Sequence, residues 1–138
     1  MVKISISYEG DLLTRSIHES GEELFTDAPR DNGGQGKHFS PTDLVATALG
    51  TCVLTLMGMA AKRVGIDLKG AHLVVTKEMK REPVRMLAKL DIVFFFPHSI
   101  DAASQEKIER AAMTCPVHAS LHPDIKQIFT FHWGTRPA

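Results

Sequence analysis

The chain has 138 residues and two cysteines, Cys52 and Cys115, which are the side chains best suited to carry out a reaction. Cys52 lies in the middle of a long apolar segment, where a free thiol most often acts as a small hydrophobic side chain. Burial there raises the pKa of a thiol, which is then inert without an arginine, a lysine or a protonated histidine beside it. We therefore expect a reactive Cys52 only where another segment supplies a cation.

Cys115 directly precedes Pro116, which suits the first position of a helix, so Cys115 is expected at a helix N-cap. Unpaired backbone amides and the helix dipole favour a thiolate at that position. Two such thiols suit a peroxide-reducing couple, in which one becomes a sulfenic acid and the other condenses with it to a disulfide. A small-molecule or protein dithiol must then restore both thiols.

The apolar segment that carries Cys52 is predicted to form a helix from Thr42 to about Val64. Ser40 is a suitable N-cap, Pro41 suits the first helical position, and Asp43 stands where a capping box has its acid. Because the segment is apolar almost all round, we expect this helix to be buried on most sides. The glycines at positions 50 and 58 predict that a neighbouring element approaches closely at both points.

The rest of the chain alternates between strand and helix patterns. Period-two apolar residues and turn residues predict strands at about 2–8, 12–18, 23–26, 70–80, 84–96 and 127–133, a loop at 27–40, a helix at about 101–113 and a short helix after Cys115. The element order indicates a single α+β domain over residues 1–138.

The composition narrows the partners and the compartment. Sixteen basic residues balance sixteen acidic ones, which argues against a nucleic acid or an anionic membrane as partner. The N-terminal residues lack the apolar core of a signal peptide, and we interpret the apolar segment at 44–61 as a core helix and not a membrane span. We expect a cytoplasmic protein, where two cysteines indicate reactive thiols or a metal site.

Two motifs carry a resemblance to a known family. SPTDLVATALGTC at 40–52 resembles the N/S-P-x-E/D-L-x-x-A-x-x-x-C helix of the OsmC/Ohr family, and Cys115-Pro116-Val117 resembles its second motif. The glycine-rich loop at 29–34 and the element order extend the resemblance over nearly the whole chain. It implies an OsmC-like α+β fold, with antiparallel sheets around a long buried central helix, in an intertwined homodimer with active sites at its interface.

The resemblance also implies a cofactor-free peroxidase that acts on organic hydroperoxides, and less on hydrogen peroxide, in oxidative or osmotic stress defence. Carried over, Cys52 is the peroxidatic cysteine, Cys115 the resolving one and Arg15 the activating cation, with Arg30 as its substitute. The implied reductant is a dithiol, either a small molecule or a lipoyl protein. Well-characterised members have a glutamate ten residues before the first cysteine, where this chain has Thr42, which favours the broader OsmC-like branch over the organic hydroperoxide resistance branch.

Two other functions stay open on the residues alone. The apolar helix and the run Val93–Phe96 are suited to line a pocket, which would make the protein a non-catalytic binder of a small hydrophobic ligand. Metal-ligand spacing is found at Cys115, His118 and His122, with His98 and His132 as further candidates. A chain with seven histidines produces such spacings by chance. No second cysteine pair completes a zinc-finger pattern, so we expect no metal.

Overall fold

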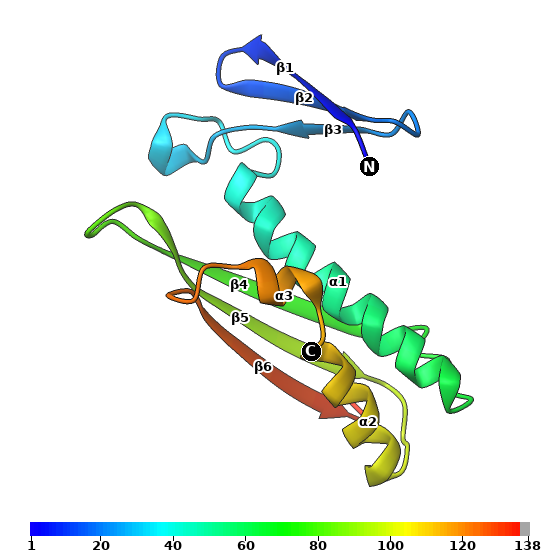
Figure 1. Cartoon of the computed structure of the whole chain (residues 1–138). Helices are drawn as coiled ribbons and strands as arrows, with labels where there is room; N and C mark the ends of the chain where they lie inside the picture. Colours follow the sequence, from blue (N-terminus) through cyan, green and yellow to red (C-terminus); the bar gives the residue numbers. More distant parts are fainter. Residues whose placement is uncertain (136–138) are drawn as a thin grey trace. The chain divides into compact units, whose positions relative to one another are not determined.

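The structure is a computed structural model that describes residues 1–135 (Figure 1). Its elements, in chain order, are β1 (Ile4–Gly10), β2 (Leu13–His18), β3 (Glu23–Thr26), the 3-10 helix η1 (Arg30–Asn32), α1 (Pro41–Arg63), β4 (His72–Lys80), β5 (Met86–Phe96), α2 (Ala102–Ala112), α3 (Pro116–Ser120) and β6 (Lys126–Trp133). The predicted α+β class is confirmed, as is each predicted helix and strand. The loop at 27–40 differs from its prediction only in containing η1.

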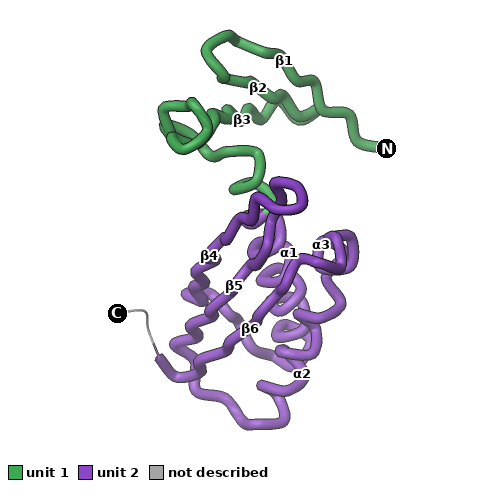
Figure 2. The backbone as a smooth tube through the Cα atoms, turned by 90° about the vertical axis from the view of Figure 1, so that its left-hand side faces the viewer, with its two compact units in different colours: residues 1–45 green, residues 46–138 purple. Residues whose placement is uncertain are grey.

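The chain divides into two compact units, Met1–Val45 and Ala46–Ala138, with the boundary inside α1 (Figure 2). The first unit holds an antiparallel sheet of order β1-β2-β3. The loop after β3 is held by Asp27, whose Oδ2 accepts the backbone N–H of Lys37 at 3.1 Å. Gly34 is required there, because a Cβ at that position would lie 1.7 Å from the carbonyl oxygen of Ala28.

The second unit holds a sheet of order β4-β5-β6, and its strand directions correct one expectation. β4 pairs with β5 antiparallel, but β6 pairs with β5 in parallel, with Leu90 opposite Gln127. The prediction of antiparallel sheets is therefore wrong for this sheet, which is mixed. The reason is that residues 97–125, including α2 and α3, cross over one face and return the chain to the end of the sheet where β5 begins.

α1 packs on the sheet of the second unit along one stripe only. Its buried residues recur every three or four positions and are Ala46, Leu49, Gly50, Val53, Met57 and Ala61. A Cβ on Gly50 would meet Leu73 Cδ1 and Val75 Cγ2, both at 3.0 Å, so the predicted close approach is confirmed there. Nothing lies within 4 Å of the corresponding point at Gly58, where that prediction is wrong.

The opposite face of α1 is exposed, so the prediction of burial on most sides is also wrong. Only one face of the helix contacts the sheet of the second unit, and Thr51, Thr55 and Met59 on the other face are exposed. α1 has the length and mean hydropathy, 1.9, of a membrane span, a test that the core helices of soluble proteins also pass. Its buried stripe and its contact with Leu73 and Val75 are those of a core helix.

Candidate thiol site

The first cysteine is positioned by a helix with a well-defined start. Ser40 Oγ accepts the backbone N–H of Asp43 at 3.1 Å, and Asp43 Oδ2 accepts the backbone N–H of Ser40 at 2.9 Å. This reciprocal pair is the predicted capping box. It fixes the first turn of α1, three turns before Cys52, whose side chain is half-buried.

The second cysteine is the N-cap of α3, as predicted, with Pro116 at the first helical position. Its side chain is fully buried. Cys115 Sγ accepts the backbone N–H of His118 at 3.4 Å, which satisfies one of the unpaired amides at the start of the helix.

The structure brings the two thiols together. A side-chain hydrogen bond links Cys115 to Cys52, and both belong to the second unit. Burial raises the pKa of the Cys115 thiol, the bond to Cys52 raises it further, and the backbone amides of His118 and Val117 oppose this with smaller effects.

The expectation that the helix end makes Cys115 a thiolate is therefore wrong. α3 has five residues, so its dipole is small, and the buried sulfur gains less from two amides than it loses by leaving water. Cys115 is the protonated partner of the pair.

His118 is part of the support of Cys115, and its contacts with β6 are what the sequence did not predict. Its Nδ1 lies 2.5 Å from Gln127 Oε1, and its backbone carbonyl accepts Gln127 Nε2–H at 3.4 Å. Its ring meets the ring of Phe129 edge-on, with centroids 5.5 Å apart. The partner residues lie on β6, the next element along the chain, and the pattern of a strand does not show which of its residues face α3.

The two candidate arginines lie in the first unit. Arg15, on β2, forms an ion pair with Glu23 on β3, which raises the pKa of Arg15 and lowers that of Glu23. Arg30 donates from Nε to the backbone carbonyl of Gln35 at 3.2 Å, within its own loop. These described contacts of the arginines are with residues of the first unit, whereas the thiols meet in the second.

Thr42 stands in the first turn of α1, and its hydroxyl is 3.2 Å from Ser40 Oγ. Asp43 next to it is occupied by the helix cap. The acid that contacts Arg15 comes from a different element, because Glu23 lies on β3. Within residues 1–135, no group of three or more His, Cys, Asp or Glu side chains is arranged to hold a metal ion, so the spaced histidines form no metal site there.

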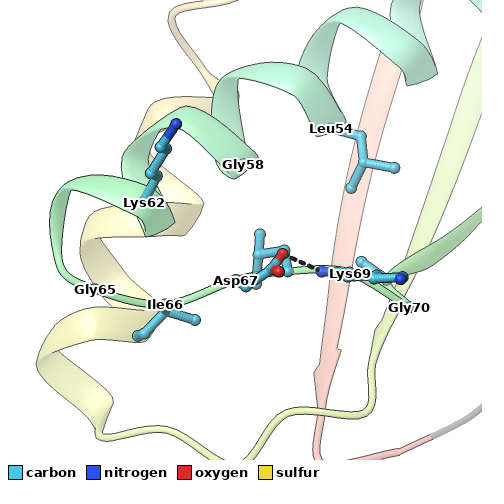
Figure 3. Close-up of a pocket in the computed structure, with 10 residues that line it drawn as sticks. Leu54, Gly58, Lys62, Gly65, Ile66, Asp67, Lys69 and Gly70 are labelled. Carbon is cyan, nitrogen blue, oxygen red and sulfur yellow. Dashed lines mark hydrogen bonds between the residues drawn. The ribbon is translucent and has the colours of Figure 1, made fainter.

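The second unit also contains a cavity of about 700 Å³ between the C-terminal half of α1 and the loop that leads to β4 (Figure 3). Its lining consists of Leu54, Gly58, Lys62, Gly65, Ile66, Asp67, Leu68, Lys69, Gly70 and Ala71. Leu54 points from the helix toward the loop, where Asp67 Oδ1 accepts the backbone N–H of Lys69 at 2.9 Å. Neither cysteine is part of this lining.

Comparison with known proteins finds one matching family and several similar solved structures. The model of the family described as OsmC, OsmC-like protein, matches residues 34–128, a range that includes both cysteines. A solved structure from Psychrobacter arcticus 273-4, named for osmotic stress induction and a detoxification response, is 43% identical, with 96% of each chain covered and a TM-score of 0.90. A search of curated proteins finds no significant match.

More distant structures share the fold. An OsmC-like protein from Mycoplasma pneumoniae is 17% identical, with 96% of each chain covered and a TM-score of 0.81. An organic hydroperoxide resistance protein, OsmC, from Legionella pneumophila is 14% identical, with 95% of this chain and 96% of that chain covered and a TM-score of 0.75. With the family match over residues 34–128, these comparisons establish that the chain belongs to the OsmC-like family.

Proposed function

We propose that this protein is a thiol-dependent peroxidase that reduces organic hydroperoxides, and hydrogen peroxide to a lesser degree, through Cys52 and Cys115. The supporting observation is the hydrogen bond between these two side chains, which stand 63 positions apart in the sequence. The thiolate is the nucleophilic form of a cysteine, and in this proposal Cys52 is the nucleophile.

In the first step the Cys52 thiolate attacks the terminal oxygen of the hydroperoxide. A sulfur–oxygen bond forms, the O–O bond breaks, and the alkoxide leaves and takes a proton from water to become the alcohol. Cys52 is oxidised to a sulfenic acid and the peroxide is reduced.

In the second step the sulfur of Cys115 attacks the sulfenic sulfur of Cys52. The disulfide forms, and the departing hydroxide combines with the thiol proton of Cys115 as water. A dithiol reductant, either a small molecule or a lipoyl protein, then exchanges twice with this disulfide, is itself oxidised to a disulfide and returns both cysteines to thiols. The reaction needs no cofactor.

The cation that activates Cys52 is Arg15 in this proposal, and Arg30 is the alternative. Arg15 is held by Glu23, so this acid does for Arg15 what a glutamate at position 42 does in well-characterised relatives. Arg30 is engaged by its own loop through Gln35, which leaves Arg15 as the better candidate.

We further propose that the protein is a cytoplasmic homodimer with the thiol sites at its interface. Several large apolar side chains of the first unit are exposed, among them Ile4, Ile6 and Tyr8, as is the outer face of α1. A second copy is the partner proposed to cover them. Free thiols as the working groups suit a reducing compartment.

The names of similar proteins support the substrate class. Structures from Legionella pneumophila and Elizabethkingia anophelis carry the name organic hydroperoxide resistance protein, and the name of the Psychrobacter arcticus protein refers to osmotic stress and detoxification. Defence against oxidative or osmotic stress is the cellular role that these names favour.

A second candidate function is the non-catalytic binding of a small hydrophobic ligand. The observation in its favour is the cavity of about 700 Å³, which Leu54, Ile66 and Leu68 line with apolar surface. In that case the thiols would take no part in the function, and a Cys52→Ser variant would still bind the ligand.

Hydroperoxide turnover separates the two functions. The wild type is expected to consume cumene hydroperoxide with dithiothreitol or dihydrolipoamide as reductant, Cys52→Ser to be inactive, and Thr130→Ala, at an exposed position of β6, to keep the wild-type rate. Absence of turnover in the wild type, or full activity in Cys52→Ser, would overturn the peroxidase proposal.

A further inference from the structure

α3 is attached to β6 by one side chain that makes two hydrogen bonds. Gln127, on β6, contacts both the ring and the main chain of His118, at 2.5 Å through Oε1 and at 3.4 Å through Nε2. Gln127 is itself fixed by the register of the sheet, where it lies opposite Leu90 of β5, a fully buried residue. The five-residue helix α3, which has no buried residue, is thus attached to the sheet of the second unit.

The two contacts determine where the protons lie. Gln127 Nε2 is the only donor of this side chain, and it serves the backbone carbonyl of His118, so Oε1 faces the ring. An amide oxygen accepts only, and therefore His118 Nδ1 carries a hydrogen and donates it. The opposite orientation of the amide would set two oxygens against each other, which excludes it.

The same residue holds the sulfur of the resolving cysteine. The backbone N–H of His118 donates to Cys115 Sγ at 3.4 Å, and the backbone carbonyl of Cys115 accepts from Ala119 at 3.0 Å. Phe129, two positions after Gln127 on β6, packs its ring edge-on against His118. Sulfur, helix and strand therefore form one chain of contacts: Cys115 to His118 to Gln127.

We infer that Gln127 and His118 are positioning residues, which hold the thiol of Cys115 beside Cys52 so that the two sulfurs combine. The biological use of this arrangement rests on the proposed function. The physical effect of the arrangement is a high effective concentration of one thiol at the other. Without the two hydrogen bonds of Gln127, α3 adopts a wider range of orientations relative to the sheet. The disulfide between the cysteines then forms less readily.

The test is the equilibrium between the Cys52–Cys115 disulfide and the dithiothreitol couple, measured on the full chain after oxidation with diamide. Gln127→Ala is expected to shift it about tenfold toward the dithiol, the factor that one or two ordinary hydrogen bonds are worth. That factor is a reduction potential higher by ~30 mV. Gln127→Glu keeps an acceptor for the Nδ1–H but sets a carboxylate oxygen against the backbone carbonyl of His118, so it is also expected to shift the equilibrium toward the dithiol.

Thr130→Ala is the matched control, because Thr130 is exposed on the same strand, and its equilibrium should equal that of the wild type. With hydroperoxide, Gln127→Ala should form the Cys52 sulfenic acid at the wild-type rate but accumulate more sulfinic acid, because resolution is slowed. An equilibrium in Gln127→Ala equal to that of the control overturns the inference, as does a Gln127→Glu variant that keeps the wild-type equilibrium.

The outcomes also separate this inference from the proposed function. A wild type that forms the disulfide with diamide, responds to Gln127→Ala, and yet consumes no hydroperoxide supports the positioning role and overturns the peroxidase. A wild type that forms no Cys52–Cys115 disulfide overturns both.

Discussion

The two thiols lie in different surroundings. Cys115 is fully buried beside Cys52, and burial and the neighbouring thiol both raise its pKa. Cys52 is half-buried in the middle of α1. In the proposed reaction, a raised pKa suits Cys115 to act second, as the resolving thiol.

The first prediction concerns the pKa of a single residue, Cys115. Its pKa lies above its ordinary value of 9.0, and Cys52→Ala should lower it toward that value, because the neighbouring Cys52 side chain contributes to the increase. The rate of Cys115 alkylation by iodoacetamide against pH, followed by peptide mass spectrometry, reports this pKa. An unchanged or higher midpoint in Cys52→Ala would contradict this effect of Cys52 on Cys115.

The sign of the linked stability is also determined. A raised pKa means that the native state favours the protonated thiol, so this contribution to stability is complete below pH 9.0 and is lost as the pH rises through the folded-state pKa of Cys115.

Arg15 gives the second prediction. Its ion pair lowers the pKa of Glu23 below the ordinary 4.5, so Arg15→Ala should return that pKa toward 4.5 in an NMR titration. The lowered pKa means that the pair contributes to stability above about pH 4.5, and that this contribution is lost as the pH falls through the folded-state pKa.

The same variant tests the proposed role of the cation. Arg15→Ala should slow the alkylation of Cys52 far more than that of Cys115, because Cys115 depends on its own surroundings. Equal effects on the two thiols would remove Arg15 from the site, and Arg30→Ala is the comparison variant.

At the scale of elements, local chemistry was enough to predict most of the fold. The capping box of Ser40 and Asp43 marked the start of α1, and period-two apolar residues marked the strands. The direction of β6 was missed because it depends on how the crossover at 97–125 returns to the sheet, which strand periodicity does not encode. The crossover's length, which exceeds that of a hairpin turn, was the signal available.

The apolar sequence of α1 also did not predict which of its faces are covered by neighbouring elements. Gly50 and Gly58 look alike in the sequence, but only Gly50 faces β4. An apolar residue indicates that burial is favourable and not which neighbour provides it, so one face of α1 was correctly predicted to be buried and the other was not.

This contrast gives the third prediction. Gly50→Ala and Gly58→Ala gain the same helix propensity, about 1 kcal/mol, but only the alanine at 50 must displace Leu73 and Val75. Gly58→Ala should therefore be more stable than Gly50→Ala by about 1–3 kcal/mol in urea unfolding. A Gly50→Ala variant at least as stable as Gly58→Ala would show that the helix does not approach β4 as described.

At the scale of the whole molecule, the meeting of Cys52 and Cys115 was beyond sequence reasoning. The motifs predicted which residues matter, but their contact depends on α1 and α3 packing over one sheet, and this involves pairings far apart in the chain. The support from Gln127 was missed for a different reason: His118 is only nine positions away, but the contact depends on how α3 packs against β6.

The exposed apolar surface of the first unit gives the fourth prediction. Ile4, Ile6 and Tyr8 project from one face of β1 and are 59%, 67% and 68% exposed. We expect the protein to sediment at twice the chain mass and Ile6→Glu to shift it toward the monomer. Ser5→Glu, on the other face of β1, is the control and should remain dimeric. A wild type that sediments as a monomer at micromolar concentration would contradict the proposed homodimer.

The most direct test of the central proposal is the fate of both sulfurs after one equivalent of cumene hydroperoxide, without reductant. Peptide mapping of the wild type should find one disulfide joining Cys52 to Cys115 and one equivalent of alcohol, and Cys115→Ser should stop at a Cys52 sulfenic acid that dimedone traps. Alcohol formation with Cys52 still a free thiol, or no alcohol at all, would contradict it.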